Sequence, residues 1–128
     1  MIDLLGNTLG VPLVKKRFDL PAGGWLEIDG YCDSPRILCE AWAHIGKPKP
    51  AQKNKVMADT MKLLFAASLD PGDHRLILAF ADDVAASHFQ GESWMAQALK
   101  AKGIETRVVE LPNDVRKRAQ LAQKRQYR

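Results

Sequence analysis

Apolar and polar positions alternate with a period of two residues in the first half of the chain, a pattern typical of β-strands. Residues 11–18 form a first extended segment, and Pro12 favours a position at the edge of a sheet. Residues 25–29 form a second strand, in which Leu26 and Ile28 share one face. The opposite face carries Trp25, Glu27 and Asp29.

A third strand is predicted over residues 36–44, and a turn at 30–35 joins it to the preceding strand as a hairpin. Glu40 stands in the middle of this apolar run, where a carboxylate is costly to bury unless it has a partner. Because side chains alternate along a strand, three others share its face. They are Leu38, Trp42 and His44.

Helical and strand patterns alternate in the second half of the chain. A helix is predicted over 50–69, and residues 75–81 form a nearly continuous apolar run that suits a central strand. A helix over 92–102 with Trp94 facing inward is followed by a strand over 106–111 and a basic helix to about residue 126. The helix over 50–69 carries a polar line at three- and four-residue steps, formed by Gln52, Lys55, Asp59 and Lys62.

This order predicts a single α/β domain over residues 1–128, in which a β-meander is followed by helix, strand, helix, strand and helix on a mixed central sheet. A length of 128 residues suits one hydrophobic core, and 46% hydrophobic with 27% charged residues is typical of a folded protein. No apolar run is long enough for a membrane span, and the first residues do not resemble a secretory signal. We therefore expect a cytoplasmic protein without membrane contact.

The net charge of +4 permits a phosphate-rich partner without requiring one. Lysines gather between residues 47 and 62, and a second basic cluster ends the chain. The cysteines, Cys32 and Cys39, do not match a zinc motif. Cys39 lies in an apolar strand and is expected to be a small buried residue.

Asp29 and Glu40 are the candidate chemical groups of the hairpin. Mg²⁺ prefers oxygen ligands and is usually held by one or two carboxylates, water and substrate phosphate. If the two strands pair with both residues on one face, both carboxylates reach a single ion. A nearby lysine would then hold the scissile phosphate or orient the attacking water.

The order of an aspartate, a strand with a central glutamate, a helix and later αβ units resembles the restriction-endonuclease-like fold of the PD-(D/E)xK nuclease superfamily. More narrowly, the chain is similar to a group of uncharacterised bacterial proteins with three motifs. Here these are Asp29-Gly30, Glu40-Ala-Trp42-Ala-His44 and Lys49-Pro-Ala-Gln52-Lys-Asn-Lys55-Val56. The resemblance covers roughly residues 25–111.

This resemblance implies a metal-dependent nuclease that hydrolyses phosphodiester bonds, with DNA as the expected substrate and Mg²⁺ or Mn²⁺ on Asp29 and Glu40. The superfamily places its lysine two residues after the glutamate, where this chain has Trp42. The following helix is then expected to supply the cation, with Lys55 the first candidate. The other residues expected at phosphate, water or nucleic acid are Gln52, His44, Lys47, Lys49 and Lys53, with Lys53 the second candidate for the cation and His44 another substitute.

Several alternatives remain open at the level of sequence. Asp29 and Gly30 also suit a turn, and Glu40 also suits a structural ion pair with a lysine of the following helix. With Trp42 in the lysine position, the chain also fits a catalytically inactive nuclease-fold domain that binds nucleic acid or a protein partner. Small nuclease folds often act as dimers, so a homodimer is among the expected states.

Overall fold

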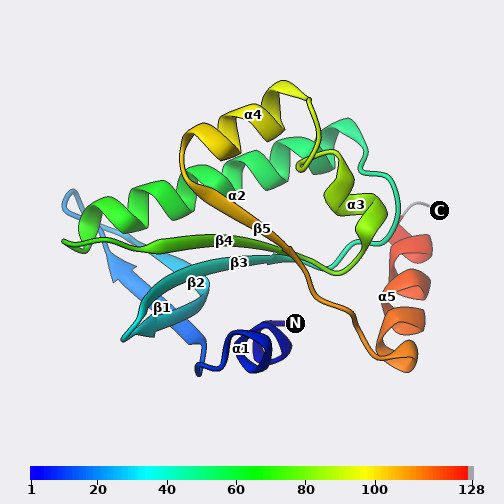
Figure 1. Ribbon diagram of the computed structural model, residues 1–128, viewed down its shortest axis with the longest axis horizontal. Coiled ribbons are helices and arrows are strands. Elements are labelled where there is room, and N and C mark those ends of the chain that lie inside the picture. The colour runs from blue at the N-terminus through cyan, green and yellow to red at the C-terminus, as the bar shows by residue number, and fades with distance from the viewer. Residues whose placement is uncertain (127–128) are drawn as a thin grey trace.

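Helices cover both faces of a five-stranded mixed sheet in the computed structural model, which describes residues 1–126 (Figure 1). The α/β class predicted from the sequence is therefore confirmed. The strands are β1 (Val14–Asp19), β2 (Trp25–Asp33), β3 (Arg36–Trp42), β4 (Arg75–Phe80) and β5 (Ile104–Val108). The helices are α1 (Ile2–Leu9), α2 (Pro50–Leu69), α3 (Asp83–Ser87), α4 (Trp94–Ala101) and α5 (Asn113–Gln126).

The strands follow their chain order across the sheet, β1-β2-β3-β4-β5. β1, β2 and β3 form an antiparallel meander, whereas β3, β4 and β5 are parallel and are connected through helices. β1 lies at the edge, as predicted from Pro12, which precedes the strand. β4 lies between β3 and β5 with nearly all of its side chains buried. The predicted meander and crossover units are thus both present.

Two hydrophobic clusters hold the layers together. On one face, Leu5 of α1 packs in a cluster with Ile37 and Cys39 of β3. Cys39 is fully buried there, so the prediction of a buried Cys39 is confirmed. On the other face, α2, α3 and α4 lie over the sheet (Figure 1). Leu63 and Phe80 are fully buried members of the second cluster, which fills this side. No helix within residues 1–126 is long and apolar enough to cross a membrane.

β2 is longer than the sequence pattern predicted. It continues through Gly30 to Asp33, so the predicted turn over 30–35 is wrong and only Ser34 and Pro35 form the turn. Gly30 allows close packing, since a Cβ there would lie 3.1 Å from Cδ1 of Ile2 in α1, a tight contact that Ile2 would have to relieve. Glycine is common in turns, but here it lies inside a strand, at a point where α1 approaches closely.

Three further predictions need correction. β3 ends at Trp42 instead of reaching His44, and β5 begins and ends earlier than the predicted range of 106–111. Trp94 does not face the core, because it is the first residue of α4 and 67% of its surface is exposed. The inward face of α4 is formed by Met95, Ala96 and Leu99.

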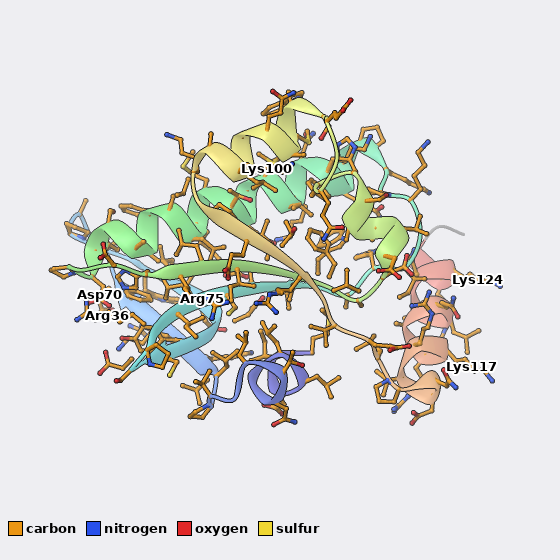
Figure 2. The ribbon with its side chains drawn as sticks, in the orientation of Figure 1. Arg36, Asp70, Arg75, Lys100, Lys117 and Lys124 are labelled. Carbon is orange, nitrogen blue, oxygen red and sulfur yellow. The ribbon has the colours of Figure 1, made fainter. Side chains whose placement is uncertain are left out.

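The two ends of α2 are tied to the sheet by polar contacts. Near its C-terminal end, Nη1 of Arg36 lies 3.8 Å from Oδ1 of Asp70, which links α2 to the start of β3 (Figure 2). Before its N-terminal end, the backbone N–H of Gly46 donates to Asp82, two residues after the end of β4 (2.8 Å). These contacts help to fix α2 over β2 and β3, where the candidate site lies.

α5 is held at the end of the parallel strands by polar contacts. Nη2 of Arg116 lies 2.6 Å from Oδ1 of the buried Asp82. Gln123 donates to the backbone carbonyl of Ile45 (2.7 Å) and accepts from its N–H (2.9 Å). Lys117 and Lys124 extend away from the rest of the molecule (Figure 2).

Replacing Asp82 by alanine is expected to lower the free energy of unfolding by about 2 kcal/mol, because one buried carboxylate accepts from Gly46, Ala85 and Arg116. These donors hold the pKa of Asp82 below its usual range, although burial acts to raise it. Urea denaturation measures the effect. The control is Asp83→Ala, an exposed carboxylate at the neighbouring position, and equal losses in both variants would contradict the assignment.

Candidate carboxylate–lysine site

A β-bulge in β2 turns Asp29 toward α2. The pairing of β1 with β2 shifts by one residue between Val14 opposite Tyr31 and Lys16 opposite Ile28, so β2 carries the extra residue. Strict alternation placed Asp29 on the face opposite to Ile28. The bulge overturns that assignment and puts both residues on the α2 side of the sheet. Ile28 packs in the cluster under α2. The charge of Asp29 acts to raise the pKa values of Asp59 and Lys62, which belong to the same helix.

Asp29 and Glu40 therefore meet on one face of the sheet. One step beyond the ladder pair of Gly30 with Cys39, Asp29 lies across from Glu40. Oδ2 of Asp29 accepts a hydrogen bond from the backbone N–H of Ala41 (3.0 Å), which fixes the carboxylate against β3. The two carboxyl groups are close enough to share a hydrogen bond when one of them is protonated. The two residues thus share one face, as the sequence required for a shared site, and metal binding there stays a prediction.

α2 supplies the opposite side of the site. Nζ of Lys62 lies 2.9 Å from Oε1 of Glu40. One turn earlier, Asp59 is largely buried and its Oδ1 lies 3.7 Å from Nζ of Lys55. The cation next to the carboxylate pair is thus Lys62, and Lys55, the first candidate from the sequence, is paired with Asp59.

Burial sets the electrostatics of this cluster. Only 3% of the Glu40 surface is exposed, and burial together with the neighbouring Asp29 raises the pKa of Glu40 to about 8 in spite of Lys62. Burial also raises the pKa of Asp59, against the effect of Lys55 and Lys62. Burial acts to lower the pKa of Lys62, but the ion pair with Glu40 leaves it raised. The site concentrates carboxylates that a cation would stabilise in the ionised form.

The donor set fits a hard divalent cation. Asp29 and Glu40 offer carboxylate oxygens from adjacent strands, and the repulsion between them is the kind that a bound cation relieves. Among residues 1–126, no group of three or more His, Cys, Asp and Glu side chains is arranged to hold a metal ion. Mg²⁺ takes much of its coordination from water and substrate phosphate, so a pair of carboxylates matches its usual demand.

Solvent reaches the cluster from its edge. Asp29 is half-buried, and 32% of the Lys62 side chain is exposed, whereas Glu40 lies beneath them. A ligand would therefore meet Asp29 and Lys62 before Glu40.

Gln52 and His44 form a separate polar group near the start of α2. Nε2 of Gln52 lies 3.3 Å from Nδ1 of His44, and its Oε1 accepts from the backbone N–H of Lys49 (2.9 Å). The ring of His44 stacks on that of Trp42, with their centroids 4.3 Å apart. Burial lowers the pKa of His44. Gln52 thus caps α2, and its amide is directed to His44 and Lys49 in this structure.

Trp42 occupies the position that the resemblance assigns to lysine. Its ring is half-buried and packs against the core cluster beneath α2. Its indole N–H is buried, and no hydrogen-bond partner for it occurs within residues 1–126. The side chain therefore serves packing, and the cation next to Glu40 comes from the helix.

The lysines expected at nucleic acid lie away from the carboxylate pair. Lys47 and Lys53 line a small cavity near α3. At about 100° per residue, Lys53 and Lys62 are on opposite sides of α2. The structure thus divides the predicted residues between two sides of this helix.

Lys62 was missed as the partner of Glu40, although a signal for it existed. It ends the polar line of α2, three residues after Asp59, and long side chains on a line that faces a sheet can reach its buried groups. The sequence contains a weaker signal for the β-bulge in β2. A glycine inside an alternating pattern often marks one, and Gly30 follows Asp29 directly.

Comparison with known proteins gave no match to a family model, to a curated protein or to a solved structure.

Proposed function

We propose that this chain is a metal-dependent phosphodiesterase acting on nucleic acid, with the restriction-endonuclease-like arrangement that its motifs resemble. Asp29 and Glu40 would hold Mg²⁺ or Mn²⁺, and Lys62 would take the part of the superfamily's lysine. The observation that carries the proposal is the convergence of these three side chains, with Nζ of Lys62 2.9 Å from Glu40.

The architecture is consistent with this proposal. The carboxylates lie on adjacent antiparallel strands, and the helix that follows β3 supplies the lysine. The buried position of Glu40 favours a site over a casual surface pair, because burial at 3% exposure raises its pKa to about 8 and a cation close by would stabilise the ionised form.

Each residue has a defined task in this proposal. A bound Mg²⁺ would supply charge neutralisation and lower the pKa of an attacking water. The backbone N–H of Ala41 holds the Asp29 carboxylate in position. Lys62, whose pKa is raised, stays protonated and stabilises negative charge on the phosphate. Lys55 lies about two turns away on the same side of α2, where it suits contact with a neighbouring backbone phosphate.

Incubation of plasmid and linear DNA with the protein tests this proposal directly. We expect cleavage that needs Mg²⁺ or Mn²⁺, that EDTA stops, and that Asp29→Asn lowers by at least about tenfold, because one charged ligand of the cation is lost. The matched control is Glu27→Gln, which removes an exposed carboxylate from the same strand. Cleavage that persists unchanged in Asp29→Asn would overturn the assignment.

A catalytically inactive nucleic-acid-binding domain is the second candidate. Trp42 in the lysine position and the ion pair of Glu40 with Lys62 favour it, because both fit a site that retains its shape without turnover. It predicts salt-dependent binding to DNA or RNA without metal-dependent cleavage. The absence of both binding and cleavage at low salt would favour a protein partner instead.

A further inference from the structure

A small cavity lies on the side of α2 away from the carboxylate pair. Its volume is about 230 Å³, and it is bounded by the segment before α2, the first turn of α2 and α3. The residues that line it are Lys47, Pro48, Lys53, Val84, Ser87 and His88. The residues around it come from two separate parts of the chain, 47–53 and 84–88, so the fold itself brings these side chains together. Figure 1 shows the start of α2 and α3 on the same side of the sheet.

Cationic groups dominate this cavity. Lys47 comes from the loop before α2 and Lys53 from its first turn. His88 follows α3, and the positive charges of both lysines are close enough to affect its protonation. Burial lowers the pKa of His88, and the two lysine charges lower it further. Nε2 of His88 lies 3.4 Å from Sδ of Met95 in α4. Within residues 1–126, the charges that shift the pKa of His88 are those of Lys53 and Lys47.

A concave site with two ammonium groups and a histidine that can gain a proton matches an anion of more than one charge. A phosphate group carries about −1.5 to −2 charges near neutral pH and offers several acceptor oxygens. The volume of 230 Å³ is below the range of about 300–1,000 Å³ typical of pockets for drug-sized ligands. The cavity therefore suits one phosphate group and its water better than a whole nucleotide.

We propose that Lys47, Lys53 and His88 form a phosphate-binding site separate from the carboxylate pair. The phosphate would come from free inorganic phosphate or from the 5′-terminal phosphate of a nucleic acid strand. The two sites lie on opposite sides of α2, so phosphate binding does not depend on any cleavage at Asp29 and Glu40. Protonated His88 adds a third positive charge to the site, so anion binding and protonation of His88 favour each other.

Histidine NMR on the full chain tests the site. Added inorganic phosphate is expected to raise the pKa of His88, since an anion stabilises the imidazolium, whereas chloride at matched ionic strength leaves it unchanged. A variant with Lys47→Gln and Lys53→Gln is expected to bind phosphate at least about tenfold more weakly. Its His88 pKa without phosphate is expected to rise, because two like charges are gone. The His88→Gln variant assigns the resonance.

The control for charge is Lys100→Gln with Lys102→Gln, which removes two exposed lysines at the end of α4. Glu40→Gln is expected to leave the His88 response unchanged, which separates this site from the proposed nuclease function. A 5′-phosphorylated oligonucleotide that shifts His88 more than its 5′-hydroxyl counterpart identifies a strand end as the source, and a response to inorganic phosphate alone identifies the free anion. The absence of any phosphate-dependent shift, or equal affinity in the Lys47/Lys53 variant and the control, would overturn the proposal.

Discussion

Replacing Lys62 by methionine is expected to lower metal-dependent DNA cleavage by about 100-fold or more, whereas Lys55→Met lowers it by less than about threefold. The two lysines lie on the same side of α2, but Nζ of Lys62 is 2.9 Å from Glu40 and Nζ of Lys55 is 3.7 Å from Asp59. Only the first is placed to stabilise charge at the carboxylate pair. Initial rates on linear DNA with Mg²⁺ measure both effects.

The loss in Lys62→Met is not expected to arise from unfolding. Without the ammonium group, the pKa of Glu40 would rise above its value of about 8, and the buried carboxyl would take up a proton instead of remaining as an unpaired charge. The side chain of Lys62 is also 32% exposed, so solvent weakens its contribution to stability. Thermal denaturation of both variants checks this point.

A common defect in both variants would change the interpretation. Equal loss of cleavage in Lys62→Met and Lys55→Met would indicate that the helix face acts through its overall charge. Full activity in Lys62→Met with strong loss in Lys55→Met would return the assignment to the residue that the sequence pattern favoured. Methionine preserves helix propensity and side-chain length in both positions, so the comparison isolates the charge.

The sequence was sufficient to predict the class of fold and the elements of the candidate site. Alternation in β2 and β3, the apolar run of β4 and the proline at the start of α2 are local signals, and the structure follows them with small shifts at the ends. Asp29 and Glu40 were singled out because carboxylates in or beside an apolar strand are unusual. Their residue types carry that information without knowledge of the surroundings.

The geometry of the site depends on features that are not local. From alternation alone, Asp29 was predicted on the face opposite to Ile28. The bulge that reverses this orientation depends on the pairing of β2 with β1. Lys62 was placed on the polar line of α2, but its contact with Glu40 depends on how that helix sits on the sheet. Trp94 shows the same limit, because the apolar pattern could not fix the first residue of α4 as exposed.

The stability of the protein is expected to fall as pH rises from 4.5 to about 8, and Glu40 is the main cause. The pKa of Glu40 is raised from its ordinary value of 4.5 to about 8, so the native state holds this proton more tightly than the unfolded chain does. The stabilisation from the proton is complete below pH 4.5 and is lost as pH rises through about 8. One pKa unit corresponds to about 1.4 kcal/mol, which gives a decrease of roughly 4 kcal/mol over this interval.

Glu40→Gln isolates this effect, because glutamine resembles the protonated carboxyl group and does not titrate. The difference in free energy of unfolding between the wild-type protein and Glu40→Gln, measured with urea at several pH values, is expected to move in favour of the variant as pH rises. Glu27→Gln, an exposed position in β2, should leave the pH profile of the wild type unchanged. A difference between wild type and Glu40→Gln that does not vary with pH would contradict a buried, protonated Glu40.

Mg²⁺ links this pH profile to the proposed site. A cation that binds the ionised carboxylates stabilises the native state at pH 8, where Glu40 has lost much of its proton, and has little effect at pH 5, where the proton occupies the same oxygens. The increase in unfolding free energy with Mg²⁺ should therefore be present at pH 8 in the wild type and absent in Glu40→Gln. An increase of equal size in both proteins would place the cation elsewhere. The combination of a pH-dependent stability with no response to Mg²⁺ would leave Glu40 and Lys62 as a structural ion pair and favour the inactive binding domain.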